Sequence, residues 1–282
     1  MSSTWHSDSP PDPVRISPLG WVMVVLRGLP LAVTVFGGLV LHLALRLVER
    51  PLHGDHRPWT PWITRAVCSI ALRLMGLTLT VHGQVMTHPG ALVANHSTWL
   101  DIFTLNARKT LYFVSKAEVA GWPGIGWLAR ATGTVFIDRN PRQARDHTRL
   151  FESRLHAGHK LLFFPEGTST DGQRVLPFRT TLFAAFFAPA LRDTCWIQPL
   201  AVRYHAPTGA PPRFYGWWGD MDFGPGLVKV LAQVPQGSVE ITCCPPLRVA
   251  DFADRKTLAR TAEQALCAAF DALSVDAPAT HS

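Results

Sequence analysis

The stretch "ALVANHSTWLDIF", residues 91–103, changes from a buried-strand pattern to a helical pattern within a few positions. The apolar run at 91–94 is typical of a strand inside a sheet, and the residues after it favour a helix. His96 stands at the end of the strand, and Asp101 follows five positions later. Ligands bind at strand ends in open α/β sheets, so this stretch predicts both the fold class and the place of a functional site.

The separation of His96 and Asp101 restricts how they can meet. On one continuous α-helix, five residues subtend about 500°, which leaves the two side chains about 140° apart. If His96 ends the strand and Ser97 or Thr98 caps the helix, the ring can fold back over the first turn, where Asp101 projects. The aspartate then holds one ring nitrogen, and the other can accept a proton from a hydroxyl. On spacing alone, a pair that only caps and stabilises the turn is the commoner alternative.

The chain beyond residue 78 continues this alternation of short apolar runs and helical stretches, which is typical of α/β domains. The predicted strands are 91–94, 134–137, 160–164 and 197–202, and the clearest predicted helices are 142–157, 179–191 and 254–273. A chain of 282 residues can bury one substantial core plus a small appendage. We therefore expect one α/β domain over residues 79–275, with a mixed sheet flanked by helices.

The N-terminal residues differ in composition from this domain. Residues 1–18 are polar and rich in proline, without the basic region and apolar core of a signal peptide, and we expect a disordered tail. Residues 28–45, "GLPLAVTVFGGLVLHLAL", run for 18 residues without an ionised side chain, close to the ~20 needed to cross a bilayer. A membrane-embedded helix is favoured over a buried core helix, because a core helix rarely stays apolar on every face.

Residues 60–79 form a second apolar stretch with a different pattern. Its apolar side chains recur at helical spacing, and Arg65 and Arg73 interrupt them at positions suited to lipid headgroups. This pattern predicts a helix that lies at the membrane interface. Residues 19–78 are therefore expected to form an N-terminal membrane-associated helical segment.

The composition also indicates a membrane. Apolar residues make up 47% of the chain and charged residues 17%, against about a quarter charged in an average soluble domain. The formal charge is +7, and the basic residues form no nucleic-acid-binding motif, so anionic lipid rather than nucleic acid is the expected partner. Arginines follow the first apolar segment at positions 46, 50, 57 and 65. The positive-inside tendency then places the domain on the cytoplasmic face of the cell inner membrane.

Three further blocks carry unusual residues in or after predicted strands. The block "GTVFIDR" (133–139) ends with Arg139, and "FPEGTSTDG" (164–172) presents a carboxylate, a glycine and a run of hydroxyls. The block "IQPLAVRY" (197–204) has a proline inside an apolar strand, which is unusual unless that strand is irregular or at an edge. The first two blocks lie at strand ends and are therefore further candidates for the functional site.

In this order and at these separations, the four blocks resemble the glycerolipid acyltransferase family, which includes 1-acylglycerol-3-phosphate acyltransferase. The resemblance covers roughly residues 80–205. It implies that His96 is the general base that deprotonates the acceptor hydroxyl for attack on an acyl thioester, and that Asp101 orients it. It also implies that Arg139 holds the acceptor's phosphate through a planar donor fork. No covalent acyl-enzyme is needed, because a thioester is already activated.

The "EGT" block is similar to sites that shape the acceptor pocket, which makes Glu166, Gly167 and Thr168 candidate substrate-binding residues. Glu166 could instead lock Arg139 or a backbone loop, since a buried carboxylate is rarely left unpaired. Gly167 is expected to allow close backbone approach. Many family members carry arginine after "EGT", whereas this chain has Ser169, which puts one phosphate contact in doubt. The candidates to replace it are Arg174, Arg179 and Lys116.

The segment "FYGWWGDMDFGPG", residues 214–226, contains two adjacent tryptophans and an acidic pair. A loop that touches lipid or lines an acyl tunnel is one interpretation, and a small aromatic core with a tight turn is the preferred one. Bacterial family members that acylate lyso-ornithine lipid resemble this chain in this segment and in the hydroxyl-rich "EGT" block. The acceptor headgroup therefore stays open, because ornithine carries no phosphate.

We thus expect an acyltransferase that moves an acyl group from acyl-coenzyme A or an acylated carrier protein to a lysolipid. The favoured acceptor is 1-acylglycerol-3-phosphate, which gives phosphatidic acid, and lyso-ornithine lipid or another lysolipid is the alternative. A non-catalytic membrane-binding protein is the alternative of another class, and a serine hydrolase is disfavoured because no G-x-S-x-G pattern occurs. No cofactor or metal is expected, since H-E-x-x-H is absent and the five cysteines lack zinc-like spacing.

Overall fold

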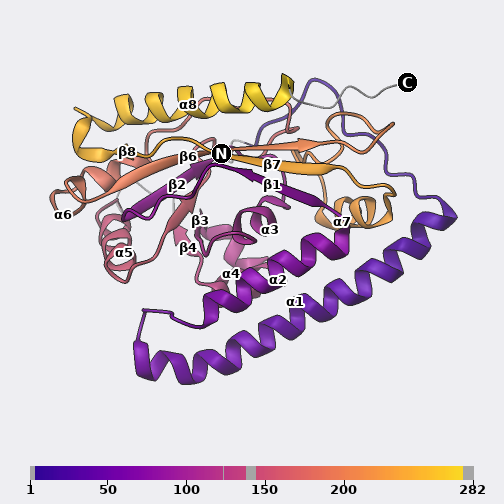
Figure 1. The fold of residues 1–282 in the computed structure, drawn as a ribbon, viewed down its shortest axis with the longest axis horizontal. Coiled ribbons are helices and arrows are strands. Elements are labelled where there is room, and N and C mark those ends of the chain that lie inside the picture. Colours follow the sequence, from indigo (N-terminus) through magenta and orange to yellow (C-terminus); the bar gives the residue numbers. More distant parts are fainter. Residues whose placement is uncertain (1–3, 123, 138–143, 276–282) are drawn as a thin grey trace.

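Strand β2 (Gly90–Ala94) explains why the sheet is covered on both faces. All its residues are buried, and its side chains alternate between two apolar cores. Leu92 and Ala94 belong to one core, and Ala91 and Val93 belong to the other. Successive side chains of a strand point to opposite faces, so a run that is apolar at every position needs a layer of helices on each side. The computed structural model, which describes residues 4–122, 124–137 and 144–275, has this three-layer arrangement (Figure 1).

The sheet has the strand order β1-β7-β6-β2-β5-β3-β4, and β8 pairs with β6. Its pairs are parallel except those of β6 with β7 and β8, so the expectation of a mixed sheet is confirmed. The other strands are β1 (Thr78–His82), β3 (Tyr112–Lys116), β4 (Val135–Ile137), β5 (Leu161–Phe163), β6 (Trp196–His205), β7 (Ser238–Cys243) and β8 (Leu247–Arg248).

Two groups of helices cover the two faces, and Figure 1 shows α8 on one side of the sheet and α1 and α2 on the other. One group consists of α5 (Ala144–His156), the 3-10 turn η3 (Leu182–Phe187), α6 (Pro189–Arg192) and α8 (Arg255–Val275). The other consists of α1 (Pro18–His53), α2 (Thr60–Met75), α3 (Asp101–Asn106), α4 (Ile125–Thr132) and α7 (Phe223–Ala232).

The predicted helices at 142–157 and 254–273 correspond to α5 and α8, whereas the prediction of one helix over 179–191 is wrong. This stretch divides into η3 and α6, because Pro189 disfavours the helical conformation of the residue before it. Ala188 accordingly has extended backbone, with φ −62° and ψ 143°.

Pro199 lies in β6, an interior strand, and is tolerated because the pairing changes at that point. The pairs with β8 end at Ile197, and the pairs with β7 begin at Leu200. The missing amide of Pro199 falls in this gap, and its carbonyl accepts from the backbone N–H of Cys244 at 3.0 Å. Of the two expectations, an irregular strand is therefore correct and an edge strand is not.

Helix α1 is long and apolar enough to cross a membrane, yet one of its faces packs on the rest of the protein along its length. Near its start, the Arg27 side chain donates to the carbonyl oxygens of Leu231 and Gln233 at the end of α7. In its middle, Gly38 lies so close to α2 that an added Cβ would clash with Val67. Near its end, buried Glu49 accepts a 2.6 Å hydrogen bond from the Thr60 hydroxyl at the start of α2.

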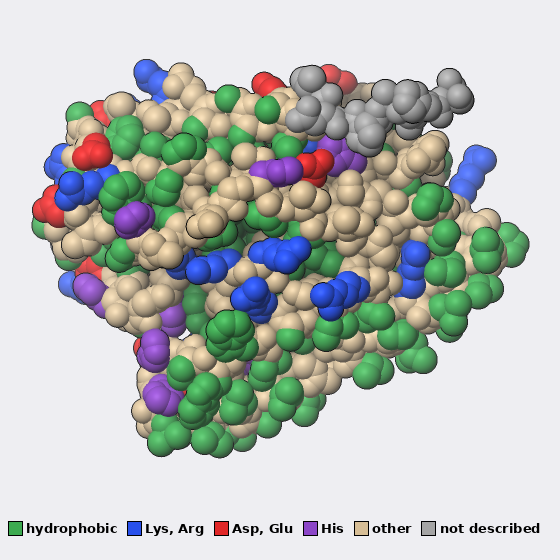
Figure 2. Space-filling view, in the orientation of Figure 1, with side chains coloured by type: hydrophobic (Ala, Val, Ile, Leu, Met, Phe, Trp, Pro, Cys, Tyr) green, Lys and Arg blue, Asp and Glu red, His purple; other side chains and the backbone are tan. Residues whose placement is uncertain are grey.

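The opposite face of α1 is apolar and exposed (Figure 2). Its exposed side chains include Leu19, Val25, Leu29, Val33, Val40 and Leu47. An exposed apolar surface of this extent is uncommon on a soluble monomer and indicates contact with lipid. This exposed apolar face supports the membrane association that the sequence predicts for the segment.

Candidate active site

His96 and Asp101 meet as the sequence predicts. The Nδ1 atom of His96 lies 2.7 Å from Oδ2 of Asp101. The chain leaves β2 after Ala94, turns, and begins α3 at Asp101. The same Oδ2 accepts the backbone N–H groups of Ser97 and Thr98 at 2.9 and 3.1 Å. The expected cap by Thr98 is present only as a long contact, since the Leu100 backbone N–H donates to the Thr98 hydroxyl at 3.5 Å, and the shorter bonds to this turn come from the Asp101 carboxylate.

The second carboxylate oxygen of Asp101 is also occupied. The hydroxyl of Tyr204, on β6, donates to Oδ1 at 2.8 Å. The Thr104 hydroxyl on α3 lies 3.2 Å from the Tyr204 oxygen. Asp101 has no exposed surface, so these protein groups rather than solvent satisfy its charge.

The His96 ring is held on one side and open on another. It stacks on Phe164, with ring centroids 4.0 Å apart and an interplanar angle of 13°. Its side chain is 20% exposed, and Nε2 has no hydrogen-bond partner in the described part of the chain. A carboxylate accepts hydrogen bonds, so Nδ1 carries the hydrogen and Nε2 presents a lone pair. The ring is therefore arranged to take a proton from an incoming hydroxyl.

Glu166 locks the backbone around this pair. Its Oε1 accepts from the backbone N–H of His96 at 2.6 Å, and its Oε2 accepts from that of Leu176 at 2.7 Å. Burial raises the pKa of Glu166 to about 8, against the opposing effect of these two N–H groups. Of the two interpretations of Glu166, its geometry favours the lock on a backbone loop.

The position of Arg139 lies outside the described residues, so its predicted phosphate contact stays a prediction. Arg174, a candidate to replace a phosphate contact, already forms a two-point ion pair with buried Asp171, at 3.2 and 2.9 Å. That pairing already neutralises the charge of Arg174 within the protein. Arg179 donates its backbone N–H to Pro165, and Lys116 ends β3.

Residues 164–172, which we call the EGT loop, lie against the turn that carries His96. Gly167 has φ +74°, a left-handed conformation that favours glycine, and the close backbone approach expected there stays a prediction. The backbone N–H of Thr170 donates to the carbonyl of His96 at 3.0 Å. The backbone N–H of Trp217 bridges the carbonyls of Ser97 and Thr170 at 2.9 and 3.2 Å. Two segments that are distant in sequence thus hold the His96 turn in place.

The N-terminal segment, residues 4–17, also reaches the EGT loop, although the sequence predicts a disordered tail over 1–18. The backbone N–H of Trp5 donates to the Thr168 hydroxyl at 3.2 Å. The Trp5 ring packs edge-on against Trp218 and under the Arg174 guanidinium. Sequence reasoning missed this contact because Trp5 and Thr168 are 163 residues apart, and no local pattern links them.

Aromatic side chains of the segment 214–226 are buried, as the preferred interpretation expects, but Phe214 and Tyr215 belong to the main apolar core that contains Tyr204 and not to a small separate one. Phe214, Tyr215 and Trp218 are buried, and the rings of Phe214 and Tyr215 meet edge-on. The indole N–H of Trp217 donates to the carbonyl of Met221 at 2.7 Å and closes the turn.

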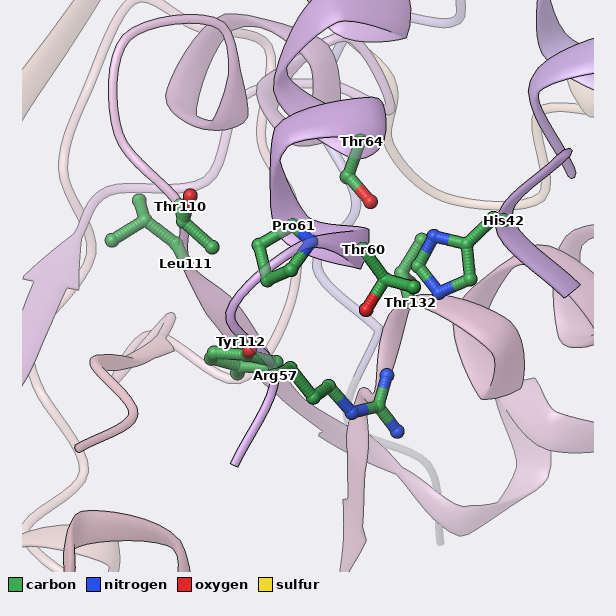
Figure 3. Close-up of a pocket in the computed structure, with 9 residues that line it drawn as sticks. All are labelled: His42, Arg57, Thr60, Pro61, Thr64, Thr110, Leu111, Tyr112 and Thr132. Carbon is green, nitrogen blue, oxygen red and sulfur yellow. The ribbon is translucent and has the colours of Figure 1, made fainter. Parts of the chain in front are cut away.

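Two cavities lie away from His96. Figure 3 shows a pocket of about 10 Å³ between α1, α2 and the start of β3, with His42, Arg57 and Thr60 in its lining. It has room for about one water and cannot hold a lipid headgroup. A cavity of about 420 Å³ lies between the N-terminal segment and residues 218–226. Among the described residues, no cluster of three or more His, Cys, Asp or Glu side chains could hold a metal ion.

Comparisons with known proteins agree on one class of enzyme. The family model described as "Acyltransferase" matches residues 78–203. The chain is 57% identical to the lyso-ornithine lipid O-acyltransferase of Rhodobacter capsulatus over 93% of this chain and 95% of that protein. It is 36% identical to the 1-acyl-sn-glycerol-3-phosphate acyltransferase of Neisseria gonorrhoeae over 51% of this chain and 58% of that protein.

The fold is similar to the crystal structure of the 1-acyl-sn-glycerophosphate acyltransferase PlsC from Thermotoga maritima. The TM-score is 0.66 at 17% identity, and the match covers 92% of this chain and 97% of that one. At this identity the likeness describes the fold alone, and it includes the N-terminal helices as well as the sheet.

Proposed function

Because the chain belongs to the glycerolipid acyltransferase family and is an acyltransferase that acts on lysolipids, we propose that its acceptor is lyso-ornithine lipid. The similarity to the Rhodobacter enzyme of that name extends over nearly the whole of both chains, whereas the similarity to the Neisseria enzyme covers about half. The EGT loop adds support, since it has Ser169 where many members have arginine and its Asp171 already pairs with Arg174. The second candidate acceptor is 1-acylglycerol-3-phosphate, the one that the sequence alone favoured.

The observation that carries the proposed chemistry is the 2.7 Å contact between His96 Nδ1 and Asp101 Oδ2, with no partner for Nε2 among the described residues. The acceptor hydroxyl gives its proton to Nε2, and its oxygen attacks the carbonyl carbon of the acyl thioester. Asp101 stabilises the resulting imidazolium. As the carbon–sulfur bond breaks, the imidazolium returns the proton to the leaving thiolate. A positioned base of this kind contributes roughly 10² to 10⁴ in rate.

The acyl donor in this proposal is acyl-coenzyme A or an acylated carrier protein, since both are thioesters. Glu166, Gly167 and Thr168 are proposed to shape the acceptor side of the site, because their loop is bonded directly to the His96 turn. Arg139 is proposed to contact an anionic group of the acceptor, which for ornithine is its carboxylate. No cofactor enters the mechanism.

We further propose that α1 lies along the cytoplasmic surface of the inner membrane, with its apolar face in the lipid. Its contacts with α2 and α7 extend from Arg27 to Glu49. A helix that crossed the bilayer perpendicularly would have to break these contacts or draw α2 and α7 into the lipid. An orientation in the membrane plane keeps them and buries the exposed apolar side chains.

The decisive experiment supplies the purified protein with acyl-coenzyme A, or with an acylated carrier protein, and a panel of lysolipids. The acylated product is identified by mass. Preferential acylation of lyso-ornithine lipid supports the acceptor assignment, and exclusive acylation of 1-acylglycerol-3-phosphate overturns it in favour of the second candidate. No acylation of any lysolipid by folded protein would contradict the assigned reaction.

A further inference from the structure

The Asp101 carboxylate has a different partner set on each oxygen. Oδ2 accepts hydrogen bonds from the His96 ring and from two backbone N–H groups, and all three donors belong to the same turn of the chain. Oδ1 accepts only the Tyr204 hydroxyl, at 2.8 Å, among the described residues. Tyr204 is 103 residues away and lies on a different strand. One side chain of β6 therefore determines how the second half of the carboxylate is bound.

We propose that Tyr204 is a positioning residue for the acyl-transfer reaction: its hydroxyl fixes the plane of the Asp101 carboxylate and restrains the basicity of the His96–Asp101 pair. This inference rests on the proposed role of His96 as the proton acceptor. It does not depend on which lysolipid is the acceptor.

Packing alone does not require this hydroxyl. In β6, Leu200, Val202 and Tyr204 alternate onto the same face of the sheet and belong to the same apolar core. A phenylalanine at 204 would fill the same space and keep the strand pattern. The hydroxyl adds a polar group to a fully buried position, which is unfavourable unless that group has a specific partner. Its partner is the carboxylate that holds the candidate base.

Tyr204 is suited to donate and not to ionise. Burial, with the neighbouring Asp101 carboxylate, raises the pKa of Tyr204 well above its ordinary value. The phenol therefore stays protonated throughout the working pH range and keeps its hydrogen bond to Oδ1. Such a bond withdraws charge from the carboxylate and weakens its pull on the Nδ1 proton. That proton then stays on the ring while Nε2 exchanges its own with substrate.

The chain provides a matched control in Tyr215. Its ring lies 5.6 Å from that of Tyr204, centroid to centroid, and is buried in the same core. Its hydroxyl lies 2.7 Å from Oε1 of Gln236 and accepts from the backbone N–H of Gly237 at 2.9 Å. A tyrosine-to-phenylalanine change at 215 thus removes a buried hydroxyl of similar setting without touching Asp101.

The test compares Tyr204→Phe and Tyr215→Phe in full-length protein, with the acyl donor and lysolipid that the wild type uses. For Tyr204→Phe we expect kcat to fall about tenfold, with the KM for lysolipid changed less than about twofold. The acid limb of the kcat/KM profile should move to higher pH, because a carboxylate that lacks the phenol stabilises the imidazolium more strongly. Tyr215→Phe should leave the pH profile in place.

A second variant guards against loss of fold. Replacement of Tyr204 by 3-fluorotyrosine keeps the ring and the hydroxyl but makes the phenol a stronger donor, so the acid limb should move to lower pH. The inference is overturned by a wild-type profile in Tyr204→Phe, by an equal shift in Tyr215→Phe, or by a fluorotyrosine shift in the same direction as phenylalanine. If His96→Ala keeps wild-type activity, the proposed reaction itself fails. If His96→Ala is inactive and these shifts are absent, only the role of Tyr204 fails.

Discussion

The backbone N–H of His96 donates to Oε1 of Glu166 at 2.6 Å, so the candidate base and the EGT loop are joined directly. The other oxygen of the same carboxylate binds the backbone of Leu176 at 2.7 Å. Glu166 is thus a bridge between the end of β2 and the loop that follows β5. Its geometry makes the position of His96 depend on a residue 70 positions away.

For His96→Ala we expect acyl transfer to fall about a hundredfold or more, with the fold retained. Asp101 keeps three other hydrogen-bond donors when the ring is removed, so the fold should be retained even though a contact with the buried carboxylate is lost. The measurement is the initial rate of product formation, with circular dichroism as the check on folding. The control is His88→Ala, an exposed histidine that stacks on Trp196. Near-normal rates in the folded His96 variant would remove its assigned role.

For Glu166→Gln we expect a loss of activity. An amide NH₂ cannot accept a hydrogen bond, and it would face one of the two backbone N–H groups that donate to the Glu166 oxygens. The kinetic readout is kcat with lysolipid in excess. A variant with full activity would show that the lock on His96 is dispensable.

Glu166 should also make stability depend on pH. Its pKa in the folded chain, about 8, is raised above its ordinary value of 4.5, so the folded state holds the proton more tightly than the unfolded state. The stabilisation is complete below about pH 4.5 and is lost as the pH rises through about 8. Melting temperatures between these values should therefore fall more steeply for the wild type than for Glu166→Gln. Parallel curves for the two proteins would contradict this account.

For Trp5→Ala we expect the KM for lysolipid to rise severalfold, with a smaller change in kcat. The variant loses the ring contacts with Trp218 and Arg174 that seat the N-terminal segment beside Thr168. Trp127→Ala is the matched control, because this side chain is 61% exposed and has no ring partner in the described residues. Equal effects of the two changes would show that the segment has no specific role at the site.

For Leu29→Glu combined with Val33→Glu we expect release of the protein from membranes. Both side chains lie on the exposed apolar face of α1, and moving a charged carboxylate into lipid is unfavourable. Leu150→Glu, on α5 at the opposite face of the sheet, should leave partitioning unchanged. The measurement is the fraction of protein that sediments with vesicles.

The proposed orientation of α1 in the membrane plane can be tested separately. Single cysteines introduced at Leu19 and Leu52, near the two ends of the helix, should react with an impermeant thiol reagent from the same side of sealed vesicles. Reaction from opposite sides would indicate a spanning helix and contradict the in-plane orientation.

Strong local patterns predicted the sheet's most buried strands and the site residues that share a turn. The run at 91–94 was recognisable because every position of β2 is buried. Strands β1, β3, β7 and β8 were not among the predicted strands. In β1 and β7, "TLTVH" and "SVEITC" mix polar and apolar residues on strands with one partly exposed face. The His96–Asp101 contact was predictable because it lies within one turn of chain.

Contacts between residues that are far apart in the sequence could not be predicted from it. Tyr204 ends the block at residues 197–204, but nothing in the neighbouring sequence indicates that its hydroxyl reaches a carboxylate on α3. The same holds for the Trp5–Thr168 contact, since polar and proline-rich composition predicts disorder when no partner surface is known. For Tyr204, the pairing of β2 with β6 in the sheet brings the partners together, and hydrophobic periodicity does not encode that strand order.

The contact of Trp5 with the EGT loop has a practical consequence for purifying and assaying the enzyme. A purification tag fused to the amino terminus would be attached close to Trp5, whose backbone N–H donates to Thr168 of the EGT loop, so we expect it to disturb this contact and lower turnover without unfolding the protein. A tag attached beyond α8 starts from the layer of helices on the other face of the sheet from α1 and α2 (Figure 1). Assays intended to rank lysolipids should therefore use material whose amino terminus carries no extension.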